Sequence, residues 1–147
     1  LLQTPIVVVS IIGGPGSGKT TLCKQLAADE SLHSVGVSLC HLSTGSLLRT
    51  IAQPRSRGVQ HPHAEMIRIM MEGGELVPDN IVCDILQKEI TKFRYRAGQY
   101  AGCAALQTSP PTGQLNLVLL DGFPVNVEQA NMLDETPLAS VRLPPRL

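Results

Sequence analysis

The sequence has 147 residues, a length typical of one domain, with 43% apolar and only 16% charged residues. This composition excludes an intrinsically disordered chain, which would combine low hydrophobicity with high net charge. Twelve basic and twelve acidic side chains cancel, and only 3% of residues are aromatic, which argues against a nucleic-acid binder, a polybasic membrane binder and a base-stacking platform. Any anion that the protein binds must be held by a local arrangement of groups.

Strands and helices alternate along the chain. Nearly unbroken runs of β-branched and aliphatic residues predict parallel strands buried on both faces, whereas apolar residues three and four positions apart predict helices. Strands separated by helices favour an α/β fold with a parallel sheet. The predicted elements are, in chain order, a strand, a helix, a strand, three helices, a strand and a helix, at 6–12, 20–28, 35–42, 45–52, 63–72, 79–91, 115–120 and 128–133.

Local signals mark several helix ends. Ser43 and Thr44 can cap the second helix, two glycines at 73–74 end the third, and Asp79 is the predicted N-cap of the fourth. The stretch 92–114 has no sustained period, and we interpret its second half as a surface loop.

The cysteines, and the lack of membrane-span and signal-peptide patterns, bear on the cellular compartment of the protein. No run reaches the roughly 18 apolar residues that a membrane span needs, and no signal-peptide pattern is present. The sequence also lacks an initiator Met, as in one that begins inside a longer product. Without a CxxC pair, a zinc cluster or redox motif has no support, and we expect reduced, mostly buried thiols in a cytoplasmic protein at Cys23, Cys40, Cys83 and Cys103.

Residues 13–20, GGPGSGKT, fit the phosphate-binding pattern GxxxxGK[ST] at every position, directly after a predicted strand and at the start of a predicted helix. Glycines let main-chain N–H groups converge on phosphate oxygens, and the helix N-terminus adds partial positive charge. Lys19 can reach the β- and γ-phosphates, and the hydroxyl of Thr20 can contact Mg²⁺. The alternative is a glycine-rich turn without a ligand.

Asp121 follows the third predicted strand, in the arrangement of a Walker B carboxylate. An acidic residue at the carboxyl end of a parallel strand points toward the crevice where ligands bind. It could hold Mg²⁺ directly or through water. The alternative is an aspartate that caps the turn before Gly122.

Four blocks together say more than a P-loop alone, and they stand at 13–19 (GGPGSGK), 41–49 (HLSTGSLLR), 73–82 (GGELVPDNIV) and 119–130 (LLDGFPVNVEQA). In order and approximate spacing they resemble the nucleoside monophosphate kinases, most of all adenylate kinase, with UMP-CMP kinase as the close relative. The resemblance implies a three-layer P-loop NTPase core at 1–42 and 76–147, and a helical arm that binds the nucleoside monophosphate at about 43–75. It also implies transfer of the γ-phosphoryl group of MgATP to that acceptor.

The resemblance assigns roles residue by residue. Lys19, Arg49 and Asp121 would be catalytic, with Mg²⁺ at Thr20 and Asp121. The guanidinium of Arg49 would clamp the acceptor α-phosphate, unless it is a solvated surface arginine. ATP would be held by Gly13, Gly14, Pro15, Gly16, Ser17, Gly18, Lys19, Thr20 and Thr21. The acceptor, with AMP favoured over UMP or CMP by Thr44 and Gln129, would contact Thr44, Arg49, Glu75, Leu76, Val77, Gly122 and Gln129.

The sequence also departs from the family pattern. Thr20-Thr21 replaces a glycine-threonine pair, Ser46 replaces an aspartate, and Val125 stands where an arginine is expected to contact the acceptor phosphate. The family's mobile LID and its last strands have no counterpart in the sequence. We therefore expect an incomplete kinase domain with strand order 2-3-1, whose first strand is an exposed edge open to pairing with another chain.

Two interpretations stay open: a nucleoside monophosphate kinase, or an ATP-binding module of the same family that has lost transfer chemistry, either a pseudokinase or a truncated product. A GTPase is disfavoured because no NKxD motif is present. The histidines His41, His61 and His63 raise the question of a metal site. His61 and His63 lie in a polar loop without acidic or thiol partners at ligand spacing, which favours solvated positions.

Overall fold

A computed structural model describes residues 6–54, 60–104 and 115–135. It confirms the predicted α/β character of the chain. The elements follow in the order β1 (Ile6–Ile11), α1 (Lys19–Ala27), α2 (Glu30–Ser34), β2 (Val37–Ser43), α3 (Thr44–Ala52), α4 (Ala64–Glu72), α5 (Asp79–Ala104), β3 (Leu115–Asp121) and α6 (Val127–Glu135).

The three strands form one parallel sheet in the order β1-β3-β2, which is the predicted 2-3-1 order. The last strand in sequence is therefore central, and within the described residues no strand pairs with the outer edge of β1. The register places Ile11, Asp121 and Ser43 side by side at the carboxyl ends of the strands. Residues that are far apart in sequence thus meet at one edge of the sheet.

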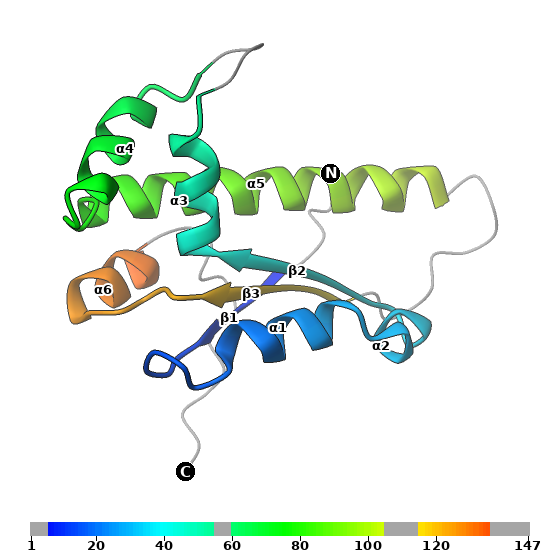
Figure 1. Cartoon of the computed structure of the whole chain (residues 1–147). Helices are drawn as coiled ribbons and strands as arrows, with labels where there is room; N and C mark the ends of the chain where they lie inside the picture. The colour runs from blue at the N-terminus through cyan, green and yellow to red at the C-terminus, as the bar shows by residue number, and fades with distance from the viewer. Residues whose placement is uncertain (1–5, 55–59, 105–114, 136–147) are drawn as a thin grey trace.

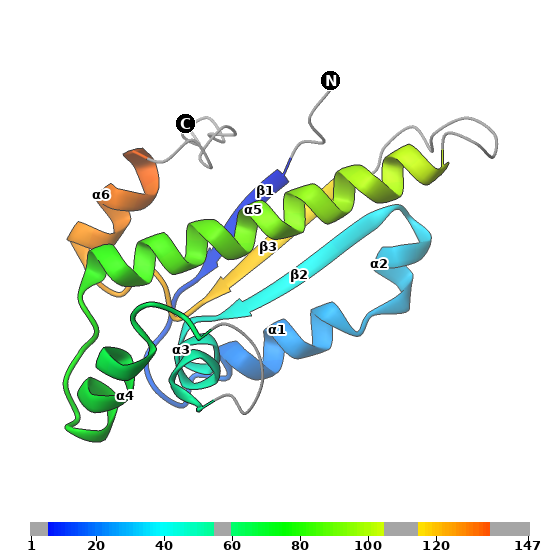
Figure 2. The ribbon, with the colours of Figure 1, turned by 90° about the horizontal axis from the view of Figure 1, so that it is seen from above.

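Helices cover both faces of this sheet, which gives the three layers expected (Figure 1). α5 crosses one face, and α1 with α2 lies on the other, as the view from above also shows (Figure 2). The helices α3, α4 and α6 gather at the carboxyl end of the strands. The loop between β1 and α1 opens at the same end.

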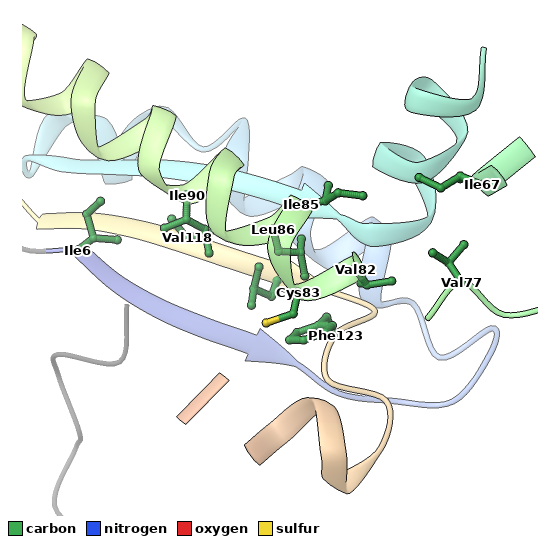
Figure 3. Close-up of a cluster of buried hydrophobic side chains, with 11 residues drawn as sticks. Ile6, Ile67, Val77, Val82, Cys83, Ile85, Leu86, Ile90, Val118 and Phe123 are labelled. Atoms are coloured by element: carbon green, nitrogen blue, oxygen red, sulfur yellow. The ribbon is translucent and has the colours of Figure 1, made fainter. Parts of the chain in front are cut away.

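The buried core lies between α5 and the sheet (Figure 3). The predicted apolar stripe of α5 supplies Ile85, Leu86 and Ile90, which are at most 3% exposed. These side chains pack in one cluster with Val118 and with Phe123, two residues after the end of β3. Removal of this apolar surface from water, at about 25 cal/mol per Å², fixes the helix against β3 and so fixes the site at its end.

A polar residue interrupts this core. Asn116 on β3 is fully buried, yet among the described residues neither its amide nitrogen nor its amide oxygen has a hydrogen-bond partner. Asn116, Val118 and Leu120 are two positions apart and so lie on the same face of β3, which packs in the core cluster. A buried amide without partners destabilises a fold, by about 1–3 kcal/mol in mutational data.

Two sequence predictions about α5 need correction. The helix continues to Ala104 instead of ending near residue 91, and Phe93, beyond the predicted end, packs against the core cluster. Asp79 does not act as an N-cap side chain: the carbonyl of Pro78 accepts from the N–H groups of Ile81 and Val82, while the Asp79 carboxylate binds Asn126 and Gln129 instead. Even α5, with 26 residues, is not apolar enough to cross a membrane, and neither is any other described helix.

Other helix ends follow the sequence. The hydroxyl of Ser43 caps α3 by accepting from the N–H of Ser46 at 3.4 Å. Gly73 and Gly74 end α4, and Gly74 has a φ of +71°. The short helix α2 was not predicted. The loop expected in the second half of 92–114 falls largely on residues 105–114, outside the described part of the chain, as do the final residues from 136.

Candidate functional site

Glycines shape the loop between β1 and α1. Gly16 and Gly18 have φ angles of +74° and +87°, in the left-handed region that other residues rarely adopt. The N–H of Ser17 donates to the carbonyl of Gly14 at 3.2 Å and closes the turn. A Cβ on Gly13 would lie 2.6 Å from the Ser17 hydroxyl, so a larger residue would displace that side chain. The loop therefore depends on the glycines that the pattern supplies.

Lys19 lies across this loop. Its Nζ donates to the carbonyls of Gly13 at 2.7 Å and Gly14 at 2.9 Å. α1 begins at Lys19 and has no acidic residue in its first turn, so the ammonium charge and the partial positive charge of the helix N-terminus act in the same place. Residues 13–18 are exposed. An anion from solvent can reach this positive region directly.

Asp121 is the buried carboxylate beside the loop. It is 4% exposed, and its Oδ2 accepts from Thr20 Oγ1 at 2.7 Å and lies 3.2 Å from His41 Nε2. Burial by itself raises the pKa of this carboxyl. Hydrogen bonds from Thr20 and His41, with the charges of His41 and Lys19, outweigh burial and hold the pKa below its ordinary value. Asp121 is thus ionised at neutral pH, and its contacts join β3 to α1 and β2 rather than capping the turn at Gly122.

α3 brings two further predicted residues to the same edge. Arg49 is exposed, donates to Ser46 Oγ at 3.3 Å, and lies with its guanidinium over Gly45. The hydroxyl of Thr44 is buried and has no hydrogen-bond partner among the described residues. Gly122, with a φ of +83°, lies against Thr44, because a Cβ on that glycine would sit 3.9 Å from the Thr44 Cβ. Thr44 and Gly122 are therefore neighbours, and the guanidinium of Arg49 is exposed to solvent.

Gln129 occupies a different setting. It is 6% exposed, its Oε1 accepts from the N–H of Val125 at 2.8 Å, and its Nε2 donates to Asp79 Oδ1 at 2.6 Å. Asn126 joins the same group by donating to Asp79 and accepting from the N–H of Gln129. In this structure Gln129 fastens the start of α6 to the start of α5. Val125, in contrast, is 69% exposed.

The segment between α4 and α5 completes the predicted set. Glu75 and Leu76 are exposed, Leu76 by 90%, whereas Val77 is buried in the core. The N–H of Glu75 donates to the carbonyl of Met70 at 2.8 Å, which holds the segment against the end of α4. Val77 therefore anchors a short exposed strip of backbone beside α3 and α4.

A family model described as an AAA domain matches residues 12–143, from the end of β1 to beyond α6. The chain belongs to the AAA domain family. The match covers the phosphate-binding loop and the acidic residue at the end of β3.

Relatives within the curated proteins sharpen this assignment. The chain is 32% identical over 124 residues to adenylate kinase 2 from Schistosoma mansoni, 30% over 133 residues to adenylate kinase from Chlamydia trachomatis serovar D, and 35% over 134 residues to adenylate kinase 4 from Arabidopsis thaliana. These alignments cover 84%, 90% and 90% of this chain, but 39%, 46% and 42% of the relatives. The chain thus spans less than half of each relative's length, and the resemblance to the adenylate and nucleoside monophosphate kinases is confirmed.

Sequence reasoning raised His41 only as one of three histidines of a possible metal site, and it did not place His41 or Cys23 beside Asp121. His41 on β2 contacts Asp121, and Cys23 on α1 lies fully buried beside both. Burial, and secondly the charge of Asp121, raise the pKa of the Cys23 thiol. His41 and Asp121 are 80 positions apart, so no local spacing could reveal the contact. The parallel register, which pairs Ser43 with Asp121 and His41 with Leu119, is the only signal that would have placed His41 near this end.

Proposed function

We propose that the chain binds MgATP and transfers its γ-phosphoryl group to a nucleoside monophosphate, with AMP as the preferred acceptor. The observation that carries the proposal is the pairing of Thr20 with Asp121 beside a P-loop, at the same sheet edge that presents Arg49. The relatives named adenylate kinase support this acceptor class. A cytoplasmic location belongs to the same proposal.

The donor side would work through charge and main-chain N–H groups. An incoming triphosphate offers Lys19 Nζ anionic oxygens in place of the neutral carbonyls of Gly13 and Gly14, which adds the attraction of opposite charges to the hydrogen bonds. Main-chain N–H groups of residues 13–20, which Pro15 lacks, would bind the remaining phosphate oxygens. ATP would therefore replace contacts that the loop now makes with itself.

Thr20 and Asp121 fit the magnesium ion that accompanies ATP. They offer a hydroxyl and an ionised carboxylate, the hard oxygen ligands that Mg²⁺ prefers, and these two groups already lie 2.7 Å apart. Held by these two residues, Mg²⁺ would supply positive charge that offsets the charge of the phosphate oxygens. The chain's own contribution is to hold these two oxygens in place, through β3 for Asp121 and the first turn of α1 for Thr20.

The acceptor would lie over α3, in an arm formed by residues 43–75. Arg49 would grip its α-phosphate with two parallel hydrogen bonds, and Thr44, Gly122 and the backbone at 75–77 would surround its base. The unpartnered hydroxyl of Thr44 supports a polar contact there. Catalysis would come from the alignment of the two nucleotides and from the positive charge around the transferred group.

An ATP-binding module with impaired transfer is the second candidate. Two observations favour it: Val125 supplies no charge where the family pattern expects an arginine, and Gln129 uses its amide on Val125 and Asp79. Each missing cationic contact raises the barrier for phosphoryl transfer directly.

The test is formation of ADP by the purified chain with MgATP and AMP, UMP or CMP in turn. Lys19→Ala is the loss-of-function variant, and Lys24→Ala, an exposed lysine on the same helix, is the matched control. Turnover that depends on Lys19 but not on Lys24, and is fastest with AMP, supports the kinase. A folded chain that binds MgATP without any turnover supports the impaired module instead.

A further inference from the structure

A cluster of three metal-ligating side chains lies beneath the phosphate loop. Cys23 from α1, His41 from β2 and Asp121 from β3 each offer one ligand atom, and these atoms lie within 4.8 Å of one another. Cys23 is 0% and Asp121 is 4% exposed, and the side chain of His41 is 14% exposed. The proposed kinase mechanism uses only Asp121, so the other two have no assigned task.

The donor atoms suit a borderline metal ion better than Mg²⁺. Thiolate, imidazole and carboxylate together are the ligand types of Zn²⁺, whereas Mg²⁺ selects oxygen ligands. Zinc bond lengths of about 2.0–2.3 Å place tetrahedral ligand atoms about 3.3–3.7 Å apart. The imidazole nitrogen and the carboxylate oxygen are already 3.2 Å apart, so only the Cys23 sulfur has to move closer to the other two ligand atoms.

Charge balance favours the same ion. A bound divalent cation removes the thiol proton outright, because metal coordination stabilises the thiolate. Thiolate, carboxylate, neutral imidazole and Zn²⁺ then sum to zero net charge, which lessens the desolvation cost of burial. The proton released from Cys23 goes to solvent, and the imidazole nitrogen that faces Asp121 gives its lone pair to the metal.

We propose that Cys23, His41 and Asp121 form a zinc site that competes with MgATP for the Asp121 carboxylate. Three protein ligands leave one tetrahedral position for water. Oδ2 of Asp121 is the oxygen that now accepts from Thr20, so a zinc ion on this atom takes a ligand that the magnesium of MgATP needs. The zinc site stands on the cluster alone, and only the competition rests on the proposed function.

The test uses Co²⁺ as a coloured substitute for Zn²⁺ on the whole chain, with a non-thiol reductant. Four-coordinate Co²⁺ bound to a thiolate gives a sulfur-to-metal charge-transfer band in the near ultraviolet, which Zn²⁺ then displaces. Cys23→Ser should abolish the band, and His41→Asn should weaken Co²⁺ binding at least about tenfold. Cys83→Ser, a buried thiol in the core away from the cluster, is the matched control and should keep the band.

A band that survives in Cys23→Ser, or no band in the folded parent chain, overturns the zinc site. Circular dichroism checks that each variant is folded, and His41→Asn decides the matter if Cys23→Ser does not fold. Addition of MgATP should raise the Co²⁺ concentration needed for half-saturation, and an unchanged titration removes the competition. The charge-transfer band can be measured without turnover. An inactive chain that shows the band would therefore contradict the kinase proposal alone, and an active chain without the band would contradict the zinc site alone.

Discussion

The two sides of the sheet's carboxyl edge differ in how their polar groups are arranged. On the phosphate-loop side, Lys19 donates to the carbonyls of the loop, and the next residue, Thr20, donates to Asp121. On the α3 side, Arg49 turns back to Ser46, and Gln129 is engaged by α5. One local motif at residues 13–20 supplies the first side except for Asp121 from β3, whereas the second side needs residues from three separate segments. We infer that the chain is better prepared for the donor nucleotide than for the acceptor.

Lys19→Ala should have the largest effect. Hydrogen bonds to charged groups contribute about 1.5–3 kcal/mol, so MgATP binding should weaken about 10- to 100-fold, and any turnover should fall at least as much. Equilibrium titration with a fluorescent ATP analogue measures this, with Lys24→Ala as the control. Equal affinity of the two variants for MgATP would contradict the difference between the two sides, because the donor side would then not depend on its phosphate loop.

Arg49→Ala should act on the acceptor side only. Loss of a charged hydrogen-bond donor predicts a KM for AMP about 10- to 100-fold higher, with the KM for ATP unchanged. Arg68→Ala on α4 is the matched control, because Arg68 is paired with Glu65 and Glu72 on the surface. Steady-state kinetics with each nucleotide varied in turn decides this, and a change in the KM for ATP alone would contradict the assignment.

Gln129→Leu tests whether this residue braces the fold or binds the acceptor. The variant removes the acceptor of the Val125 N–H and one of the two amide donors to Asp79, so the free energy of unfolding should fall by about 1–3 kcal/mol. Urea denaturation measures the loss, and Asn131→Ala on the exposed face of α6 should stay within about 0.5 kcal/mol of the parent. Unchanged stability with a raised KM for AMP would instead favour a direct contact.

Asn116→Leu extends the comparison to the opposite end of β3. There a buried amide has no partners among the described residues, in contrast to Asp121 at the other end, so a leucine of similar size should stabilise the chain by about 1 kcal/mol. The same urea denaturation measures the gain. Destabilisation by more than about 1 kcal/mol would indicate that the amide has partners, and Asn80→Leu at an exposed position gives the baseline.

Much of the fold could be predicted because its signals are local. The strand runs, the loop at 13–20 and the glycines at 73–74 each carry their own conformational preference, and the three-strand order followed from the family resemblance. The end of α5 could not be predicted from apolar period. Residues 92–104 contain alanine, lysine and arginine, which favour helix without any apolar pattern.

The candidate site also divides into residues that local signals predicted and residues that they did not. Lys19, Thr20 and Asp121 were predicted because a pattern fixes the first two and a strand end fixes the third. The placement of His41 and Cys23 beside Asp121 was not predicted, because it exists only once β2, β3 and α1 are packed. The neighbours of Asp79 in the sequence predicted a helix cap. In the structure its carboxylate instead accepts long-range hydrogen bonds from Asn126 and Gln129.

Calorimetric titration of one preparation of the chain with MgATP, and separately with AMP, tests the difference between the two sides most directly. The account predicts that MgATP binds at least about tenfold more tightly than AMP, since the donor side keeps its charged groups while the acceptor side has one arginine fewer than the family pattern. It also predicts that Lys19→Ala removes the MgATP signal and leaves the AMP signal in place. AMP binding as tight as MgATP binding, or MgATP binding that survives Lys19→Ala, would contradict it.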